Sequence, residues 1–371
     1  MPEGVIKEIS VFTIDLPYSH GTYTLSSGRE YTKFDSTIVR ITTANGIEGW
    51  GESTPFGATF VAAHGRGVRA GIEEIAPHLI GQDPRRVDRI NEIMDGALLG
   101  HEHAKAALDI ACWDIFGKSV GLPVCELLGG STEMALPLIS SIHVAEPAEM
   151  RSQVSKYRKQ GYLGHSVKVS GDPVKDAERI KSSLADKKAD EFFIVDANCG
   201  LSAETALRML RLLPNNLDFV LEAPCSTPRE TLSLRRRTDV PIYIDELAIS
   251  ESSVIEFIAE DAAEGINIKI SKNGGLTKSR RLRDLCLAAG YMFSVQDTVG
   301  SDLSFAAIVH LAQTVPEKNL RCILDPTEMV TVRTAHPSID VVEGRAMAPK
   351  LPGLGITPNL SVLGRPVACY R

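Results

Sequence analysis

From Leu136 onward, short apolar runs alternate with stretches whose apolar residues recur at helical spacing. Apolar runs without polar alternation indicate strands buried on both faces, and strands that alternate with helices indicate a parallel sheet with right-handed crossovers. We therefore predict a closed parallel barrel rather than an open doubly wound sheet, because polar strand ends recur on successive strands. The candidate strands are Leu136–His143, His165–Val169, Phe192–Asp196, Phe219–Glu222, Ile242–Asp245, Ile266–Ile270, Tyr291–Val295 and Cys322–Leu324. Helical stretches between them include Asp176–Ala185, Ala203–Leu213, Ser252–Ala259 and Thr277–Ala289.

The segment before the barrel has its strands first and its helices second, which predicts an α+β unit. We expect the helical stretch His103–Lys118 to bury one face, which carries Ala107, Ala111 and Ile115. The predicted domains are residues 1–130 for this unit, 131–333 for the barrel and 334–371 for a segment that returns to the first unit. The patterns are two alternating runs, a hairpin signal and two helical stretches: Val5–Leu16, Ser36–Thr43, Asn45-Gly46 before Ile47–Gly51, Ala70–Leu79 and His103–Lys118.

Three acidic residues, Asp196, Glu222 and Asp245, each close one of the apolar runs, 26 and 23 residues apart. That spacing is one strand-plus-helix unit, and a parallel barrel gathers the carboxyl ends of its strands around one mouth. Three carboxylates facing one another repel unless a divalent cation lies among them, and ligands made only of oxygen favour Mg²⁺ over zinc or copper. The alternative is that each acid caps a helix or pairs with an arginine, which is less favoured for three consecutive strands.

Two lysines bracket these acids at the same spacing. Lys168 lies 28 residues before the first acid and Lys269 lies 24 residues after the last. Each is flanked by β-branched residues inside an apolar run, which is rare for a lysine on a solvated surface. Burial and a nearby cation both lower a lysine pKa toward the range in which the neutral amine accepts a proton. We therefore predict two bases facing a metal-held carboxylate, and we interpret Lys272 as a loop lysine.

These parts are what α-proton abstraction from a carboxylate requires, because the cation stabilises the enediolate charge that develops. At these residues the chain resembles the enolase superfamily, in the muconate-lactonizing-enzyme-like subgroup of the mandelate racemase/muconate lactonizing enzyme family, where a lysine base works with Mg²⁺. The resemblance covers essentially the whole chain. It rests on three stretches: Ala107-Leu-Asp-Ile-Ala-Cys-Trp-Asp114, Leu127-Leu-Gly-Gly130 and Lys269-Ile-Ser-Lys-Asn-Gly-Gly275.

The resemblance implies a modified (β/α)8 TIM barrel of the (β/α)7β type, with an α+β capping domain completed by the C-terminal segment. It also implies Mg²⁺ on the three acids, catalysis by Lys168 and Lys269, and a homo-oligomer. The chain departs from the usual Lys-x-Lys of the second strand, because the first of those lysines is Ser166 here. The seventh strand ends in Ser294–Thr298 without a histidine, which disfavours a site of the mandelate racemase kind.

Within the subgroup, four stretches resemble cis-3-hydroxy-L-proline dehydratases and the related proline betaine epimerases. The implied reaction is dehydration of cis-3-hydroxy-L-proline to a pyrroline-2-carboxylate. The alternative is an epimerase or racemase of proline betaine, 4-hydroxyproline betaine or another amino-acid derivative. The stretches are Leu221–Cys225, Asp261–Gly265, Ser294–Thr298 and Phe305–Gln313.

Substrate contacts are expected from two places, the loops of the first domain and the carboxyl ends of the strands. Aromatic side chains on those loops can contact a cationic amine. Either Asp297 or Asp325 can pair with a substrate ammonium. The candidates are Tyr18, Tyr23, Thr54 and Phe56 on the loops, and Asn198, Gln296, Asp297 and Thr298 at the strand ends.

Composition narrows the setting in which this chemistry takes place. The chain has 371 residues and a net charge of −7 without basic clusters, which argues against nucleic acid as a partner. No apolar stretch approaches the roughly 20 residues that cross a membrane, and the first residues lack a secretion-signal pattern. Seven cysteines without a CxxC pair indicate reduced thiols. We expect a cytoplasmic enzyme whose partner is a small-molecule carboxylate, a proline derivative.

Two other classes remain as alternatives. A Schiff-base lyase would use one buried lysine without a metal and would leave the ring of acids unexplained. A non-catalytic binding protein would be expected to lose one or more of the five positions, and all five are filled. Among enzymes, a dipeptide epimerase or a sugar acid dehydratase is also possible, because a fold does not determine its substrate.

Overall fold

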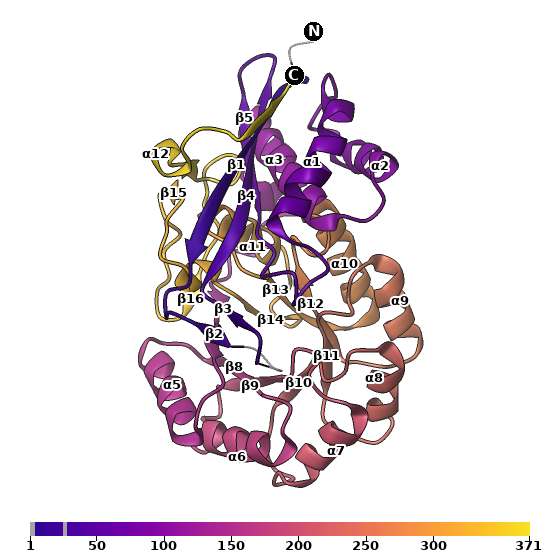
Figure 1. The fold of residues 1–371 in the computed structure, drawn as a ribbon, viewed down its shortest axis with the longest axis vertical. Helices are drawn as coiled ribbons and strands as arrows, with labels where there is room; N and C mark the ends of the chain where they lie inside the picture. Colours follow the sequence, from indigo (N-terminus) through magenta and orange to yellow (C-terminus); the bar gives the residue numbers. More distant parts are fainter. Residues whose placement is uncertain (1–3, 25–27) are drawn as a thin grey trace.

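A parallel barrel forms the lower half of the molecule in the computed structural model, which describes residues 4–24 and 28–371 (Figure 1). Its eight strands follow one another in space in the order in which they occur along the chain. A parallel bridge between Leu138 and Ile323 links the last strand to the start of the first. The strands are β7 (Ile139–Ile142), β8 (Gly164–Lys168), β9 (Phe192–Asp196), β10 (Val220–Glu222), β11 (Ile242–Ile244), β12 (Gly265–Lys269), β13 (Met292–Gln296) and β14 (Leu320–Ile323).

One helix connects each barrel strand to the next, so the described part of the chain forms a (β/α)7β barrel, as predicted. Helices α6, α7, α9 and α10 overlap the helical stretches given above as examples. Helix α11 is buried along its whole length, so its apolar residues show no single face. The helices are α5 (Pro147–Lys159), α6 (Pro173–Leu184), α7 (Ala203–Arg211), α8 (Pro228–Arg235), α9 (Glu251–Ala259), α10 (Leu276–Ala289) and α11 (Asp302–Ala312).

The capping domain lies above the barrel and is built on an antiparallel sheet with the strand order β18-β1-β4-β5. Its outer strand comes from the C-terminal end of the chain, which confirms that the tail completes this domain (Figure 1). A small hairpin, β2–β3, reaches down toward the barrel mouth. The elements are β1 (Ile6–Pro17), β2 (Tyr23–Thr24), β3 (Glu30–Tyr31), β4 (Lys33–Thr43), β5 (Glu48–Ser53), β18 (Ala368–Tyr370), α1 (Gly65–Leu79), α2 (Val87–Ala97), α3 (Glu102–Val120) and α4 (Val124–Leu127).

The chain returns from the barrel to the capping domain through short elements. A first pair joins β15 to β17, and a second pairs β16 with β6, the strand that leads into the barrel. The elements are β6 (Leu136–Pro137), the 3-10 helix η2 (Pro326–Met329), β15 (Ala335–His336), β16 (Arg345–Ala346), β17 (Thr357–Pro358) and α12 (Leu360–Leu363).

Helix α3 is buried on all sides over 103–115, so the prediction of one buried face is wrong. The helix contacts strands β4 and β5 and helices α1, α2, α4 and α10, so elements of both domains bury it. Its backbone also comes very close to β5. A Cβ atom at Gly49 would lie 2.2 Å from the Ala111 carbonyl oxygen, and one at Gly51 would lie 2.1 Å from the Ala107 carbonyl oxygen. Glycine at these two positions is therefore what allows the strand and helix to pack.

Two buried carboxylates of the capping domain cap helices of the barrel. Glu52, at the end of β5, accepts hydrogen bonds from the backbone N–H groups of Ser301 and Ser304 at the start of α11, at 2.9 and 3.1 Å. Asp109 of α3 accepts from the backbone N–H and the hydroxyl of Thr277 at the start of α10, at 2.9 and 2.6 Å. A carboxylate satisfies the unpaired N–H groups of a helix start and interacts favourably with its dipole. These contacts hold the capping domain over the barrel mouth.

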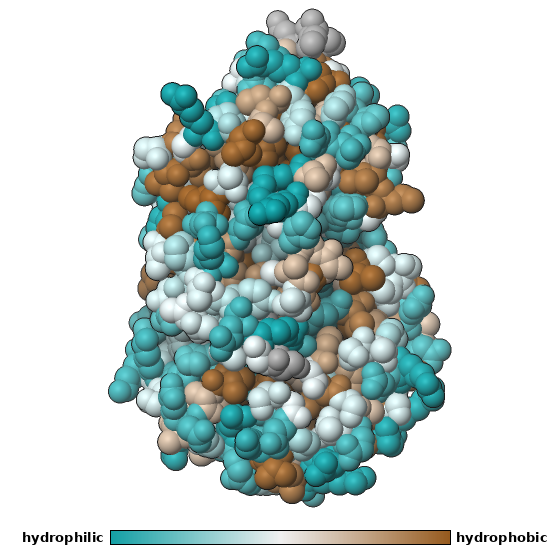
Figure 2. Space-filling model, viewed as in Figure 1, coloured by the Kyte–Doolittle hydropathy of each residue, from teal (hydrophilic) through white to brown (hydrophobic). Residues whose placement is uncertain are grey.

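The face of the molecule drawn in Figure 2 mixes hydrophilic and hydrophobic residues over both domains. Across residues 4–24 and 28–371, no helix combines the length and the apolar character that crossing a membrane requires.

The substitution Glu52→Gln should destabilise the protein by about 2–3 kcal/mol, because either orientation of the amide turns its NH₂ group toward a backbone N–H donor. Urea titration followed by circular dichroism would measure the change in the free energy of unfolding. Glu317→Gln, which changes an exposed glutamate, should stay within about 0.5 kcal/mol. Equal losses in the two variants would contradict the role assigned to Glu52.

Candidate active site

The five predicted residues lie at the carboxyl ends of five consecutive barrel strands. Lys168, Asp196, Glu222 and Lys269 are the last residues of β8, β9, β10 and β12, and Asp245 directly follows β11. The register pairs Lys168 with Asp196, and Asp196 with Glu222. Strands β8 and β12 are four positions apart in a closed ring of eight, so the two lysines stand on opposite sides with the acids between them.

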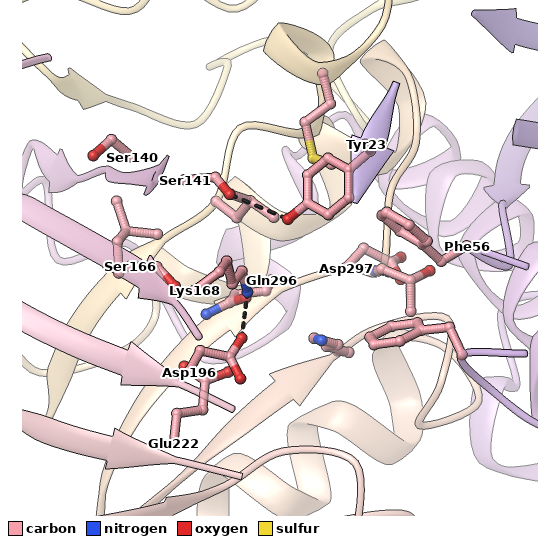
Figure 3. A pocket seen from close by; sticks show the side chains of 16 residues that line it. Tyr23, Phe56, Ser140, Ser141, Ser166, Lys168, Asp196, Glu222, Gln296 and Asp297 are labelled. Carbon is pink, nitrogen blue, oxygen red and sulfur yellow. Dashed lines mark hydrogen bonds and ion pairs between the residues drawn. The ribbon is translucent and has the colours of Figure 1, made fainter. Parts of the chain in front are cut away.

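The acids are almost fully buried, with exposed fractions of 1% for Asp196, 3% for Glu222 and 0% for Asp245. Each aspartate is paired with one of the two lysines that were predicted to be catalytic. The Lys168 amine donates a short hydrogen bond to Asp196 Oδ2 (Figure 3), and the Lys269 amine lies 2.5 Å from Asp245 Oδ2. The Glu222 carboxylate accepts a hydrogen bond of 2.5 Å from the Asn267 side chain.

The pKa of each lysine shifts in the direction opposite to the one expected from the sequence. Burial by itself disfavours the ammonium form, but the charges of Asp196 and Glu222 outweigh it and raise the pKa of Lys168. Burial is likewise outweighed by Asp245 and its acidic neighbours, which raise the pKa of Lys269. The prediction from the sequence was a lowered pKa, because it considered only burial and a nearby cation. In the structure the nearest charges to each amine are carboxylates, which raise the pKa.

Lys272 belongs to the site, although the sequence suggests an ordinary loop lysine. It lies in the turn after β12 and is only 7% exposed. Its amine donates to the Asp245 backbone carbonyl and lies 3.0 Å from Asp245 Oδ1. Burial acts to raise the pKa of Asp245, and the ammonium groups of Lys269 and Lys272 reverse that effect and lower it to about 2. The signal that could have revealed Lys272 is its spacing of three residues from Lys269.

The residues fit a divalent cation that prefers oxygen ligands. Burial and then the charges of Asp196 and Asp245 raise the pKa of Glu222 well above its usual range, so this carboxylate lacks a sufficient positive partner. As the side chains stand, no three Asp, Glu, His or Cys groups of the described residues form a coordination shell. Asp196 and Asp245 are instead turned to their lysines. The donor set is nevertheless composed only of buried carboxylates, which suits Mg²⁺.

A cavity of about 50 Å³ lies over this ring, between the barrel mouth and the capping domain (Figure 3). Of the predicted substrate-binding residues, Phe56, Gln296, Asp297 and Thr298 line it. Tyr23, predicted on the same loop as Tyr18, lines it too, together with residues that the prediction did not include: Phe60, Ile139, Ser140, Ser141, Ser166, Leu324 and Met329. Phe60 of the capping domain lies on a segment without regular periodicity, so its position could not be read from the sequence pattern.

Three predicted substrate-binding residues lie outside this cavity. Tyr18 lines an adjoining chamber. The Thr54 hydroxyl is directed to Ser36 and Glu52, at 2.8 and 3.0 Å. The Asn198 side chain amide donates to Asp196 Oδ2 at 3.0 Å and to Glu246 at 3.2 Å, so it orients the acids instead of lining the cavity.

Asp297 lines the cavity, but donors of the protein occupy both of its carboxylate oxygens. One oxygen accepts from the Thr298 N–H at 2.7 Å, and the other accepts from the Ser271 hydroxyl at 2.7 Å. Burial raises the pKa of Asp297 to about 6, although the hydrogen bonds from these donors act to lower it. The carboxylate therefore fixes the loop after β12 to the end of β13.

Comparison with known proteins agrees with the geometry over nearly the whole chain. Residues 12–129 match the N-terminal domain family of mandelate racemase and muconate lactonizing enzyme, and residues 149–362 match the enolase C-terminal domain-like family. A cis-3-hydroxy-L-proline dehydratase from Roseibium aggregatum is 42% identical over 98% of this chain and 99% of its own. Other relatives, at 28–30% identity, are a racemase, an epimerase and a cycloisomerase.

Solved structures give the same result. A mandelate racemase/muconate lactonizing enzyme homologue from Aspergillus oryzae superimposes with a TM-score of 0.95 at 66% identity, covering 98% of this chain and 99% of its own. A homologue from Roseovarius nubinhibens, whose crystal structure contains magnesium, superimposes with a TM-score of 0.97 at 49% identity, covering 99% of this chain and 100% of its own. The chain therefore belongs to the mandelate racemase/muconate lactonizing enzyme family of the enolase superfamily, and it is an enzyme.

Proposed function

We propose that this enzyme is a Mg²⁺-dependent dehydratase that converts cis-3-hydroxy-L-proline to a pyrroline-2-carboxylate. The observation that carries the proposal is the pair of lysines on opposite sides of three buried carboxylates, with both lysines, Asp196 and Glu222 lining one small cavity. The choice of substrate is supported by the similarity to the Roseibium aggregatum dehydratase along the full length of both chains. The small cavity also suits a compact substrate.

The reaction requires one lysine to take the α-proton. The bond between Cα and hydrogen breaks, and its electron pair forms a double bond to C3 as the bond from C3 to oxygen breaks. The hydroxyl group departs with a proton as water, and the resulting enamine gains a proton at C3 and loses its N–H proton to become the cyclic imine. Lys168 and Lys269 approach the substrate from opposite faces, so the configuration at Cα selects which of them is the base.

The carboxylates of Asp196, Glu222 and Asp245 would hold the Mg²⁺. When bound, the ion supplies positive charge that offsets the three acids and stabilises the substrate carboxylate as the α-proton leaves. Lys272 fixes the Asp245 carboxylate from the side facing away from Lys269. The Asn198 backbone N–H donates to Asp196 Oδ1 at 2.8 Å, whereas the Lys168 amine donates to Oδ2, so both aspartates keep their orientation when the lysines change protonation state.

Epimerisation of a proline betaine or another amino-acid derivative is the second candidate. Dehydration needs a single base, whereas exchange of configuration at Cα needs one on each face, and both lysines line the same cavity. Relatives that are racemases and epimerases support this alternative.

Incubation of the protein with Mg²⁺ in D₂O and a panel of proline derivatives would separate the two candidates. The expected result, detected by proton NMR, is deuterium entry coupled to water loss from cis-3-hydroxy-L-proline. Deuterium entry with inversion and without water loss would instead assign an epimerase. Absence of exchange with every member of the panel would contradict both.

Replacement of either catalytic lysine, Lys168→Ala or Lys269→Ala, should reduce kcat by about 100- to 10,000-fold for the substrate enantiomer whose α-proton that lysine takes. The reason is loss of the general base, and α-deuterium exchange measures it for each enantiomer separately. Lys350→Ala, at an exposed lysine outside the site, is the control and should keep full activity. Full exchange in both site variants would exclude the lysines as bases.

Removal of Mg²⁺ with EDTA should abolish exchange, and added Mg²⁺ should restore it. Glu222→Gln should weaken Mg²⁺ binding about tenfold or more in calorimetry, because one of three charges is lost while the side-chain shape is kept. Asp340→Asn, an exposed carboxylate, should bind Mg²⁺ like the unmodified protein. Unchanged affinity in the Glu222 variant would place the ion elsewhere.

A further inference from the structure

Each aspartate of the acid ring has one carboxylate oxygen bound by a group other than the two predicted bases. The Asn198 backbone N–H donates to Asp196 Oδ1 at 2.8 Å. The Lys272 amine lies 3.0 Å from Asp245 Oδ1. The second oxygen of each aspartate accepts a hydrogen bond from the amine of one predicted base. Each aspartate therefore has one oxygen held away from the bases and one oxygen directed at them.

One oxygen of Glu222 is also held, and its donor is Asn267. The side-chain amide of Asn267 donates to Glu222 Oε1 at 2.5 Å, and the described residues provide no other donor to this carboxylate. Asn267 lies on β12 two residues before Lys269, so both side chains point to the same face of the strand. Asn267 is fully buried, and it therefore holds Glu222 from inside the barrel, beneath the catalytic cavity.

The oxygen of the Asn267 amide is unpaired. Its Oδ1 atom is buried and has no hydrogen-bond partner among the described residues. Reversing the amide would place this oxygen against the Glu222 carboxylate, so the orientation is fixed. The paired residue on β13 is Ser294, whose hydroxyl instead lies 3.2 Å from the Cys322 thiol.

This unpaired oxygen indicates why an asparagine occupies the position. A buried acceptor without a donor costs about 1–3 kcal/mol, and an apolar side chain of similar size would avoid that cost. Packing of the barrel interior alone therefore does not explain Asn267. Its hydrogen bond to Glu222 does, because it fixes one oxygen of an acid that has no lysine partner.

Divalent ions differ in what they require from a carboxylate. Mg²⁺ is small and binds carboxylates at short distances with strict geometry, whereas Ca²⁺ is larger and readily accepts both oxygens of one carboxylate. Because Asn267 holds Oε1, only Oε2 of Glu222 is free for an ion. The hydrogen bond therefore disfavours binding through both oxygens, and it disfavours Ca²⁺ more than Mg²⁺.

We propose that Asn267 is a positioning residue that makes the acid ring selective for Mg²⁺ over Ca²⁺. It limits Glu222 to one oxygen for the ion, as Asn198 and Lys272 do for the two aspartates. Selectivity matters for the reaction because an ion with longer bonds to oxygen stabilises a developing carboxylate charge less. The proposal rests on the proposed function, since it requires a divalent ion at this ring, and it adds the residue that selects the ion.

Calorimetric titration of the metal-free protein with Mg²⁺ and, separately, with Ca²⁺ tests the proposal. In Asn267→Leu the side chain keeps nearly the same shape but loses the donor, so Glu222 gains a second free oxygen. The ratio of the Mg²⁺ to the Ca²⁺ association constant should fall about tenfold. Asn319→Leu is the matched control and should keep the ratio, because it removes a buried amide that donates to the Tyr291 carbonyl at 3.3 Å, outside the site.

Asn267→Ser, with a side chain too short to bond Glu222, should lower the ratio in the same way. It provides a second test if circular dichroism shows that Asn267→Leu does not fold. A structural role alone would weaken binding of both ions by the same factor, and that result overturns the proposal. An unchanged ratio, or an equal change in Asn319→Leu, overturns it as well.

The outcomes also separate this proposal from the proposed reaction. An unchanged ratio in a protein that dehydrates cis-3-hydroxy-L-proline rejects the role of Asn267 alone. Mg²⁺ selectivity that depends on Asn267, in a protein without dehydration, rejects only the reaction. Absence of binding of either ion to the unmodified protein rejects both.

Discussion

Charge balance at the barrel mouth is the constraint on which the rest of the site depends. Three carboxylates and three lysine amines share a space that excludes most water, where an unpaired charge is expensive. The two aspartates satisfy this requirement through Lys168, Lys269 and Lys272, whereas Glu222 has only an amide donor. The deficit at Glu222 is the physical reason why a divalent cation suits this ring. It also means that the lysines are held as ammonium groups until another positive charge takes over their role.

The capping domain closes the barrel mouth over the acids and lysines. Its own buried carboxylates, Glu52 and Asp109, bind the starts of α11 and α10, so two helix dipoles hold the domain in place. Tyr23 of β2 and Phe56 of the loop after β5 then line the cavity over the acids. The predicted catalytic groups thus lie at strand ends of the barrel, whereas these capping-domain residues lie on a short strand and a loop, which can change without disturbing the lysines.

The boundary between the cavity over the acids and the adjoining chamber is a place where substrate size can change within the family. Relatives of this chain include a dehydratase, a racemase, an epimerase and a cycloisomerase. Tyr23 and Ser141 line both cavities, and their hydroxyls lie 3.3 Å apart. This contact is made by one capping-domain residue and one barrel residue, so a change at either can merge the cavities or seal them. Substrate size can therefore change while the acid ring stays the same.

The amino-acid pattern alone was enough to predict the barrel, the capping domain and the five strand-end residues, because strand periodicity and parallel topology convert chain spacing into position around a mouth. It did not determine which way Lys272 points, since a turn has no periodicity to orient a side chain. It also missed that α3 is buried all round, because its neighbours come from both domains. The sign of the pKa shift on Lys168 was decided only by tertiary structure. A pKa depends on distances to every nearby charge, and those distances exist only once the strands have been brought together.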